Sequence, residues 1–256
     1  MHRLPLNLIP LPLLAGCDLL GDLAGYANPM VMEATLVGVE TPDPALVDLT
    51  GTTLEGGTVA TVLLADATQM EDLAEAPLAG ARVELRIDDG EWRALRDESE
   101  GKYLLDEGLT YVAGQAVAIR IQGDPDHGAT VRAPDVLDVT VAAEHAAGAP
   151  LVVQTEAEGI AHLALVVMDI AAGEVLFDNR PTSIEDIYAL THGGGQRAVE
   201  VPGVVFSRPG AYVVGVAGLA VSAEEDLDNL NTTISALTAG TIRFYPVTVG
   251  AWDEQE

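Results

Sequence analysis

Cysteine, aromatic residues and basic residues are all scarce in this chain of 256 residues. Its one cysteine, at position 17, excludes a disulfide bond within the chain. Because aromatic residues make up 4% of the sequence, a buried core must be built from Val, Leu, Ile and Ala. Hydrophobic residues reach 48%, which is enough for a sizeable core and excludes a wholly disordered chain.

Basic residues are outnumbered by acidic residues, 12 against 40, which gives a formal net charge of -28. No Lys or Arg occurs between Cys17 and Arg82. Such a chain repels phosphate backbones and anionic lipid headgroups, which excludes nucleic-acid binding and electrostatic attachment to a membrane surface. We interpret the charge as a source of solubility, with a cation-attracting surface as the alternative.

Hydrophobic runs of transmembrane length are also missing from the sequence. Residues 4–14 and 211–221 form the longest runs, and Gly215 and Gly218 interrupt the second. Crossing a bilayer takes about 20 apolar residues in a helix. Because the first run follows Met-His-Arg and precedes small residues, it predicts a signal peptide.

The residues Leu14-Ala15-Gly16-Cys17 at the end of this run resemble the lipobox of bacterial lipoproteins. In that family the cysteine thiol is acylated and the peptide bond before it is cleaved. The resemblance implies a signal peptide at residues 1–16, a lipid anchor on Cys17 and a place in the cell envelope outside the cytoplasm, at the inner or the outer membrane. Acylation also explains a lone thiol in an exported chain. The alternative is a free or buried cysteine after a chance hydrophobic run.

Short runs of strand-forming residues follow a predicted tether at residues 17–30. Gly and Pro, 26 and 14 in number, punctuate the chain in the way that turns between many short strands require. The predicted strands are residues 32–40, 58–65, 81–87, 91–95, 102–105, 115–121, 130–133, 136–142, 151–155, 160–168, 174–177, 197–201, 211–216, 232–237 and 241–249. Helical signals are limited to one turn or surface loop at residues 68–71 and a short helix at 183–190.

Alternation within these runs separates buried from exposed positions. Hydrophobic residues at 83, 85 and 87 alternate with charged residues at 82, 84 and 86, so we expect one buried and one charged face. The turn Asp88-Asp89-Gly90 predicts a hairpin with the next strand. The same rule predicts a first core with Val83, Leu85, Ile87, Val117, Ile119 and Ile121, and a second with Leu163, Leu165 and Val167.

This spacing of strands predicts an all-β fold of two antiparallel Ig-like or prealbumin-like β-sandwiches after a signal peptide and short tether. The first sandwich is expected at residues 31–145 and the second at 150–250. The boundary is placed in the stretch without alternation that ends in Gly148 and Pro150.

Two further resemblances support sandwich modules. Residues 77–85, Pro-Leu-Ala-Gly-Ala-Arg-Val-Glu-Leu, followed by Gly101-Lys102-Tyr103, resemble the start of carboxypeptidase-regulatory-like and related Ig-like modules. This implies a small sandwich that binds or spaces rather than catalyses. Residues 208–214, Arg-Pro-Gly-Ala-Tyr-Val-Val, resemble a strand common in Ig-like and fibronectin-like sandwiches. That resemblance implies a buried Tyr212 ring whose hydroxyl finds a partner.

Catalytic and zinc-binding patterns are missing from the sequence. None of the five serines lies in a G-x-S-x-G motif, and the histidines are scattered without metal-ligand spacing. Gly193-Gly194-Gly195 lacks the flanking strand and helix of a phosphate-binding loop. We therefore predict a chain that is not an enzyme and has no resident cofactor other than a possible ion.

Calcium is the ion for which the sequence offers donors. Residues 124–128 and 224–231 are oxygen-rich loops between strands, without the EF-hand spacing. In the second loop Asp226, Asp228 and Asn231 are the predicted Ca²⁺ ligands. Leu227 and Leu230 are expected to fix this loop to the core.

These observations predict a non-catalytic cell-envelope lipoprotein that acts as a binding or scaffolding subunit. Its partners would be the membrane, through the lipid anchor, and an unknown envelope protein or glycan. The alternative is a carbohydrate-binding or hydrolase-accessory module. An exposed aromatic platform, from Trp92 or Trp252, would distinguish the second function from the first.

The anchor is tested by the substitution Cys17→Ala, which removes the lipid acceptor. The wild-type protein is expected in the detergent phase on Triton X-114 partitioning and the variant in the aqueous phase, because a lipid chain contributes about 0.8 kcal/mol per buried CH₂. Equal partitioning of the two proteins would contradict the anchor.

Overall fold

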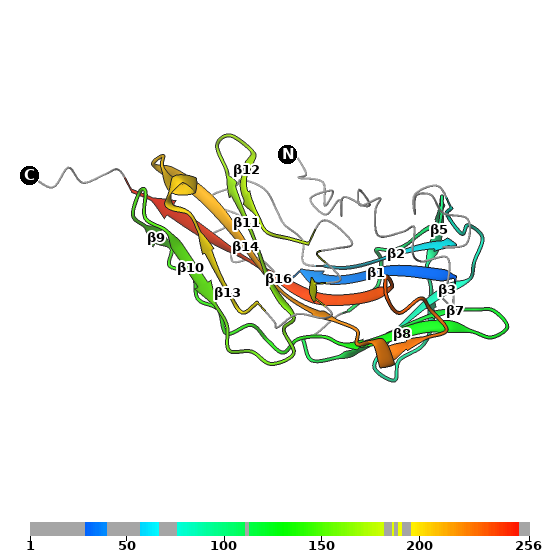
Figure 1. Ribbon diagram of the computed structural model, residues 1–256. Coiled ribbons are helices and arrows are strands. Elements are labelled where there is room, and N and C mark those ends of the chain that lie inside the picture. Colours follow the sequence, from blue (N-terminus) through cyan, green and yellow to red (C-terminus); the bar gives the residue numbers. More distant parts are fainter. Residues whose placement is uncertain are drawn as a thin grey trace, which may run out of the picture.

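The computed structural model describes residues 29–39, 57–66, 76–110, 113–181, 186, 189–190 and 196–250 (Figure 1). Its long elements in these ranges are all β-strands, which confirms the predicted all-β class. The strands form three sheets around two large hydrophobic cores. None of the described helical residues belongs to a helix long and apolar enough to cross a membrane.

The largest sheet has nine strands and extends along the whole molecule (Figure 1). Its order is β12-β11-β14-β16-β1-β2-β6-β5, and β9 pairs with the last residues of β16. Neighbours are antiparallel except that β1 and β9 run parallel to β16. Its strands are β1 (Met30–Val39), β2 (Gly57–Asp66), β5 (Arg96–Ser99), β6 (Lys102–Leu105), β9 (Glu144–His145), β11 (His162–Asp169), β12 (Glu174–Asp178), β14 (Gly210–Val221) and β16 (Ala236–Val249).

Two smaller sheets pack against one face of the large sheet. The five-stranded sheet has the order β15-β8-β7-β3-β4, and the other consists of β10 and β13. Their strands are β3 (Val83–Ile87), β4 (Arg93–Ala94), β7 (Ala116–Ile121), β8 (His127–Arg132), β10 (Leu151–Gln154), β13 (Ala198–Val201) and β15 (Leu227–Asp228). Short 3₁₀ turns, η4 (Gly203–Phe206) and η5 (Glu224–Asp226), join some of them.

The first core lies between the large sheet and the five-stranded sheet. Five of the six residues predicted for it are 0–3% exposed, and the sixth, Ile87, is partly buried against the same cluster. Alternation therefore predicted the inward face of β3 and β7 correctly. The hairpin is also confirmed, because β3 pairs with β4 across the turn at residues 88–90.

The second core lies between the large sheet and the strands β10 and β13. All three residues predicted for it, Leu163, Leu165 and Val167, are fully buried on β11. Phe206 of η4 and Tyr212 of β14 fill its far end with their rings in edge contact. The Tyr212 hydroxyl donates to the carbonyl of Arg208 at 2.8 Å, as the sequence resemblance implied.

The two cores share the strands β14 and β16. In β14, Tyr212, Val214 and Val216 belong to the second core and Ala220 to the first. In β16, Leu237 and Ala239 lie in the first core and Val247 and Val249 in the second. The predicted boundary between residues 145 and 150 therefore does not separate the two cores. Residues 220–239 follow this boundary in the sequence but complete the first core.

Residues 136–142 differ from the prediction in a second way. Leu137, Val139 and Val141 are buried, as the alternation requires, but the segment forms no strand and belongs to the second core. Its position is fixed in part by the Tyr245 hydroxyl, which donates to the carbonyl of Val139 at 2.9 Å. Gly218 of β14 makes room for it, since a Cβ there would lie 2.7 Å from the Leu137 side chain.

The strand predicted at residues 232–237 begins later, at Ala236. Before it, the Asn231 side chain accepts a hydrogen bond from the amide of Thr233 at 3.2 Å, and the Asn231 carbonyl accepts one from the amide of Ser235 at 2.9 Å. Local turns of this kind compete with strand pairing. The β-branched residues at 232–234 therefore form a turn.

The sequence Gly101-Lys102-Tyr103 connects β6 to the segment before β3. The Tyr103 ring is 1% exposed, and its hydroxyl donates to the carbonyl of Leu78 and accepts from the amide of Ala81. Gly101 has a φ of +70°, and a Cβ there would lie 2.4 Å from the carbonyl oxygen of Leu64. The motif thus needs a glycine at position 101, where the backbone passes close to Leu64, and a tyrosine at position 103, whose hydroxyl makes both hydrogen bonds.

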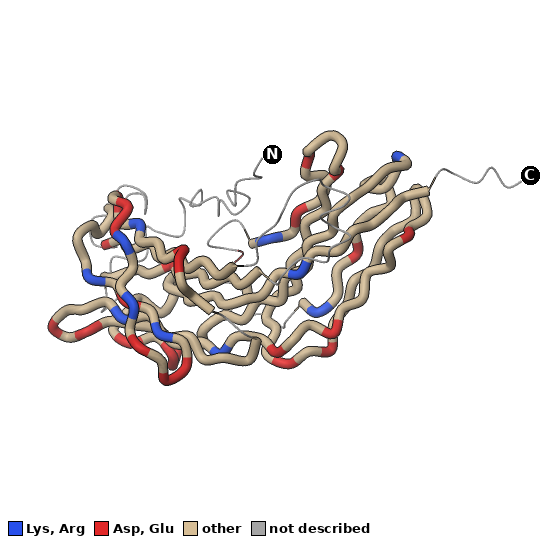
Figure 2. Tube along the Cα trace, turned by 180° about the vertical axis from the view of Figure 1, so that it is seen from behind, with Lys and Arg blue, Asp and Glu red and all other residues tan. Residues whose placement is uncertain are grey.

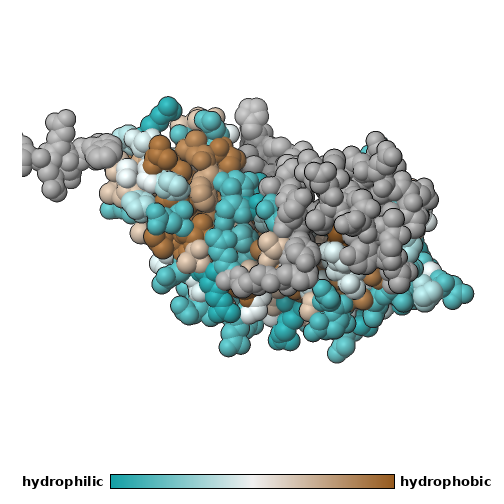
Figure 3. Space-filling view, viewed as in Figure 1, coloured by the Kyte–Doolittle hydropathy of each residue, from teal (hydrophilic) through white to brown (hydrophobic). Residues whose placement is uncertain are grey.

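The outer face of the large sheet is also rich in hydrophobic residues. Glu33 lies on this face, opposite Leu63 of β2 and Ala236 of β16. Burial in these surroundings raises the pKa of the Glu33 carboxyl from 4.5 to about 7. Figure 3 shows further hydrophobic residues at the end of the molecule that holds the second core.

The substitution Leu85→Ala tests the strand register, because Leu85 is 1% exposed in the first core. We expect a loss of about 2–5 kcal/mol in the free energy of unfolding in urea. The control Val152→Ala, at a side chain that is 56% exposed, should change it by less than about 0.5 kcal/mol. Equal effects of the two substitutions would contradict the register.

Glu33→Gln tests the raised pKa through the pH dependence of stability. A carboxyl whose pKa is higher in the folded state stabilises the fold below its unfolded pKa and loses that contribution as the pH rises toward 7. The variant should therefore match the wild type near pH 4.5 and exceed its stability by about 1–3 kcal/mol at pH 8. The exposed control Glu174→Gln should show no such gain.

Candidate functional site

The outer face of the five-stranded sheet collects basic side chains. Side chains alternate across a sheet, and the register places Glu84 of β3 beside Arg120 of β7. Residues 82–132 contain seven of the 12 Lys and Arg residues of the chain. Figure 2 shows several blue segments at the end of the molecule that holds the five-stranded sheet. The side chains that share this face are those of Arg82, Glu84, Arg86, Ala118, Arg120, Gln122, Thr130 and Arg132.

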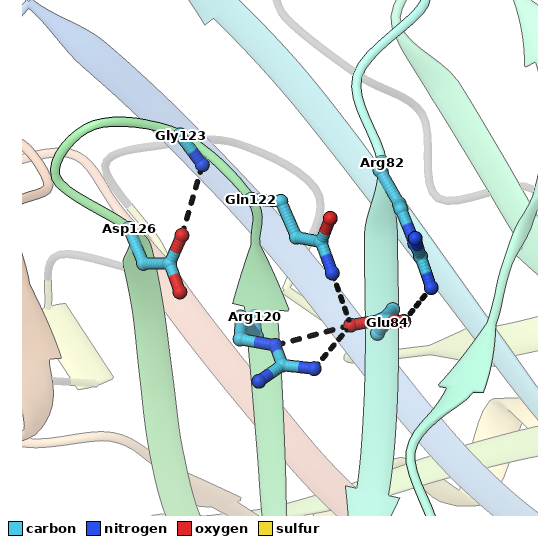
Figure 4. Close-up of polar contacts among 6 residues, drawn as sticks. All are labelled: Arg82, Glu84, Arg120, Gln122, Gly123 and Asp126. Carbon is cyan, nitrogen blue, oxygen red and sulfur yellow. Dashed lines mark hydrogen bonds and ion pairs between the residues drawn. The ribbon is translucent and has the colours of Figure 1, made fainter.

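Glu84 is the buried centre of this face (Figure 4). It is 4% exposed, although alternation predicted a solvated charged position. Its Oε2 accepts hydrogen bonds from Nε of Arg120 at 3.0 Å, from Nη2 of Arg120 at 2.5 Å and from Nε2 of Gln122 at 3.1 Å. Its Oε1 accepts one from Nη2 of Arg82 at 2.9 Å. Both carboxylate oxygens are therefore occupied.

These donors determine the charge state of Glu84. The hydrogen bond from Arg120 lowers the pKa of the carboxyl below 4.5, and this effect outweighs burial, which would raise it. Glu84 is therefore ionised at neutral pH. An ionised carboxylate at this depth is stable only because charged and polar donors replace the water that it loses.

Trp92 packs against two guanidinium groups of this face. The Cζ of Arg120 lies 4.4 Å from the centre of the Trp92 ring, and the Cζ of Arg86 lies 4.7 Å from it. These are cation–π distances, and each such contact contributes about 0.5–1 kcal/mol at a partly exposed site. The ring thereby holds two like charges close together. Because guanidinium groups cover it in part, Trp92 is not an open aromatic platform.

The two oxygen-rich loops come together at one edge of the same sheet. Nδ1 of His127 lies 2.6 Å from the carbonyl oxygen of Asn229, and Nδ2 of Asn229 donates to the carbonyl of Asp126 at 2.8 Å. Leu227 and Leu230 are buried in the first core, as predicted. The loop at 224–231 is thus fixed by its hydrophobic residues and by the neighbouring loop.

The predicted Ca²⁺ ligands occupy different surroundings. Asp226 lies near the Thr130 hydroxyl at 3.5 Å, and Asp228 is exposed on β15. Asn231 is 2% exposed, and its side-chain oxygen already accepts from Thr233. Within the described ranges no three His, Cys, Asp or Glu side chains gather to hold a metal ion. The Ca²⁺ site stays a prediction.

The described histidines make hydrogen bonds to the backbone. His127 contacts the carbonyl of Asn229, and Nε2 of His145 and of His162 lie 3.0 Å from the carbonyls of Ala149 and Asn179. The hydroxyl oxygens of Ser222 and Ser235 accept from the amides of Leu237 and Met32, which fixes the start of β16. These histidines and serines therefore have structural roles.

Several predicted features lie outside the described residues. They are the lipobox with Cys17, the turn at residues 68–71, the helix at 183–190 except for residues 186 and 189–190, the glycines at 193–195, and Trp252.

No protein-family model matches the chain, and no curated protein matches it in sequence. Among solved structures, a chain of the complex of Dpr11 IG1 with DIP-gamma IG+IG2 is similar over 86% of this chain and 98% of its own length, at 10% identity and a TM-score of 0.23. The CbhA fibronectin(III)-like modules of Clostridium thermocellum are similar over 89% and 98%, at 9% identity and a TM-score of 0.22. We draw the fold class from the strands and cores described above.

Glu84→Gln tests the buried carboxylate. At pH 7 it should lower the free energy of unfolding by about 1.5–3 kcal/mol, because Arg120 loses a charged acceptor. A carboxyl whose pKa is lowered in the folded state stabilises the fold above its unfolded pKa and loses this contribution as the pH falls through the folded pKa. The difference from the wild type should therefore shrink below pH 4.5 in urea melts. A difference that stays constant from pH 7 to pH 3 would contradict the lowered pKa.

Proposed function

We propose that this chain is a non-catalytic binding or scaffolding subunit of the bacterial cell envelope, held at a membrane by lipid on Cys17. The observation that carries the binding role is the outer face of the five-stranded sheet. There a chain with a net charge of -28 keeps three arginines in place around Glu84 and Trp92.

The surroundings of the described histidines support a binding role. In the described part of the chain, each histidine is held by a backbone carbonyl, and none contacts a serine hydroxyl or a carboxylate. A nucleophile needs a base within hydrogen-bond distance, and that base needs a group to orient it. None of the described histidines meets this requirement.

The shared strands support a scaffolding role. β16 has 14 residues and passes through both cores, so it spans roughly 45 Å at about 3.3 Å per residue. Because β14 pairs with it from residue 210 to residue 221, no flexible linker separates the two ends of the sheet. A partner bound at one end would therefore keep a fixed distance from whatever contacts the other.

The carbohydrate-binding alternative depends on an exposed aromatic ring. Sugar rings stack on an open aromatic face, whereas the Trp92 ring is partly buried and contacts two guanidinium groups. This geometry favours a partner that presents charged or hydrogen-bonding groups. We therefore place the protein-binding role ahead of the carbohydrate-binding one.

The proposal is tested by photo-crosslinking in whole cells. A photoreactive residue at Thr130, on the outer face of β8, should give a discrete crosslinked product, and the same residue at Val204, which is 77% exposed at the other end, should give less. The product should decrease in the Cys17→Ala background, because the chain is no longer held beside envelope partners. A product that forms equally well at both positions would contradict a binding role for this face.

A further inference from the structure

Arg86 lacks the acidic partner that Arg82 and Arg120 have in Glu84. Among the described residues Arg86 makes no ion pair, and its Nε is buried without a hydrogen-bond partner. Buried polar groups left without partners are rare in native proteins and often mark the place of an ion or ligand.

Glu84 is not available to pair with Arg86. Its Oε1 accepts from Arg82, and its Oε2 accepts from Arg120 and Gln122. Arg120 uses two of its nitrogens, Nε and Nη2, on that one carboxylate. Arg86 has the same fork of donors, so its partner must come from outside this cluster.

The neighbours of Arg86 restrict its motion. In the sheet register Arg86 lies opposite Ala118 of β7, and Ala118 lies opposite Thr130 of β8. These two side chains are short, and the large group in contact with the guanidinium is the Trp92 ring. Contact with Trp92 holds the guanidinium in place before a ligand arrives, which reduces the entropy lost on binding.

We propose that the face formed by Arg86, Trp92 and Arg120 binds a carboxylate group of a ligand, with Arg86 as the residue that pairs with it. This inference rests on the proposed binding function and names the chemistry of its partner. Guanidinium groups bind carboxylates through two parallel hydrogen bonds, one to each carboxylate oxygen. In this cluster both nitrogens that Arg120 directs at Glu84 donate to one oxygen, Oε2. A planar carboxylate presents its two oxygens side by side, which matches two neighbouring N–H groups of a guanidinium.

The test uses Trp92 as the reporter and glutarate as the probe. In the full chain with Cys17→Ala and Trp252→Phe, Trp92 is the remaining tryptophan, so its fluorescence reports contact with its two arginines. Glutarate should change the fluorescence saturably. Arg86→Gln should weaken this binding at least tenfold, and Arg86→Lys should weaken it less, because lysine keeps the charge but not the fork. The exposed control Arg197→Gln should leave binding unchanged.

Three outcomes would overturn the carboxylate site. The first is a fluorescence response to glutarate equal to that of NaCl at the same ionic strength. The second is unchanged glutarate binding in an Arg86→Gln variant whose melting temperature is also unchanged. The third is tighter binding of inorganic phosphate than of glutarate. The peptide Gly-Glu-Gly, capped at both ends, separates the sources of the carboxylate. If the peptide binds at least tenfold tighter than glutarate, the carboxylate belongs to a protein partner. If it binds equally well or more weakly, the carboxylate belongs to a small free acid.

The crosslinking at Thr130 tests the proposed function and the glutarate titration tests the carboxylate site, so either experiment can fail without the other. If Thr130 crosslinks as expected but glutarate does not bind, the binding function stands and its carboxylate chemistry is wrong. If glutarate binds at Arg86 but Thr130 gives no selective product, the site stands and the envelope-partner function is wrong.

Discussion

The antiparallel pair of β14 and β16 is the element on which both halves of the molecule depend. The two strands pair continuously from Gly210 with Val249 to Val221 with Thr238. Their inward residues supply one core at one end and the other core at the other end. Small residues make this length possible, because Gly218 admits the Leu137 side chain and Gly215 lies against the Phe244 ring. A larger residue at either position would push apart groups that the shared sheet requires to be in contact.

The charged face shows how an acidic chain concentrates its few cations. Three arginines share one carboxylate or one indole ring within a small area, and each would repel the others without these partners. The buried carboxylate loses its hydration, which costs several kcal/mol, and four hydrogen bonds offset that loss. The same bonds fix the arginines, so the network that stabilises Glu84 also prepares the surface for a ligand.

Local periodicity was sufficient to predict the buried positions, but long-range pairing could not be predicted from it. Leu85, Ile119 and Leu165 lie in their cores because a strand shows one face inward, and a period of two reveals that face. The same rule predicted that Glu84 faces solvent. It could not reveal the partner of Glu84, because Arg120 is 36 residues away in the sequence. Gly215 and Gly218 suggested interruptions of this run, whereas each lies against a neighbouring side chain, of Phe244 and Leu137 respectively. Residues 136–142 showed the alternation of a strand, yet burial alone does not supply a strand with a hydrogen-bonded neighbour.

The parallel pairing of β1 with β16 has a consequence for the order in which the chain can fold during its synthesis. β1 is the first described strand, and its partner residues 236–242 are made about 200 residues later, since Glu33 pairs with Ala236. Until then the first core lacks Leu237 and Ala239, and the edge of β1 has no neighbour on that side. Contacts this distant in sequence slow folding, and strand edges left open are sites of misassembly. A ribosome must therefore extend the chain through β16 before either half of the molecule closes, and a chain that stops short of β16 would have two unfinished cores instead of one intact domain.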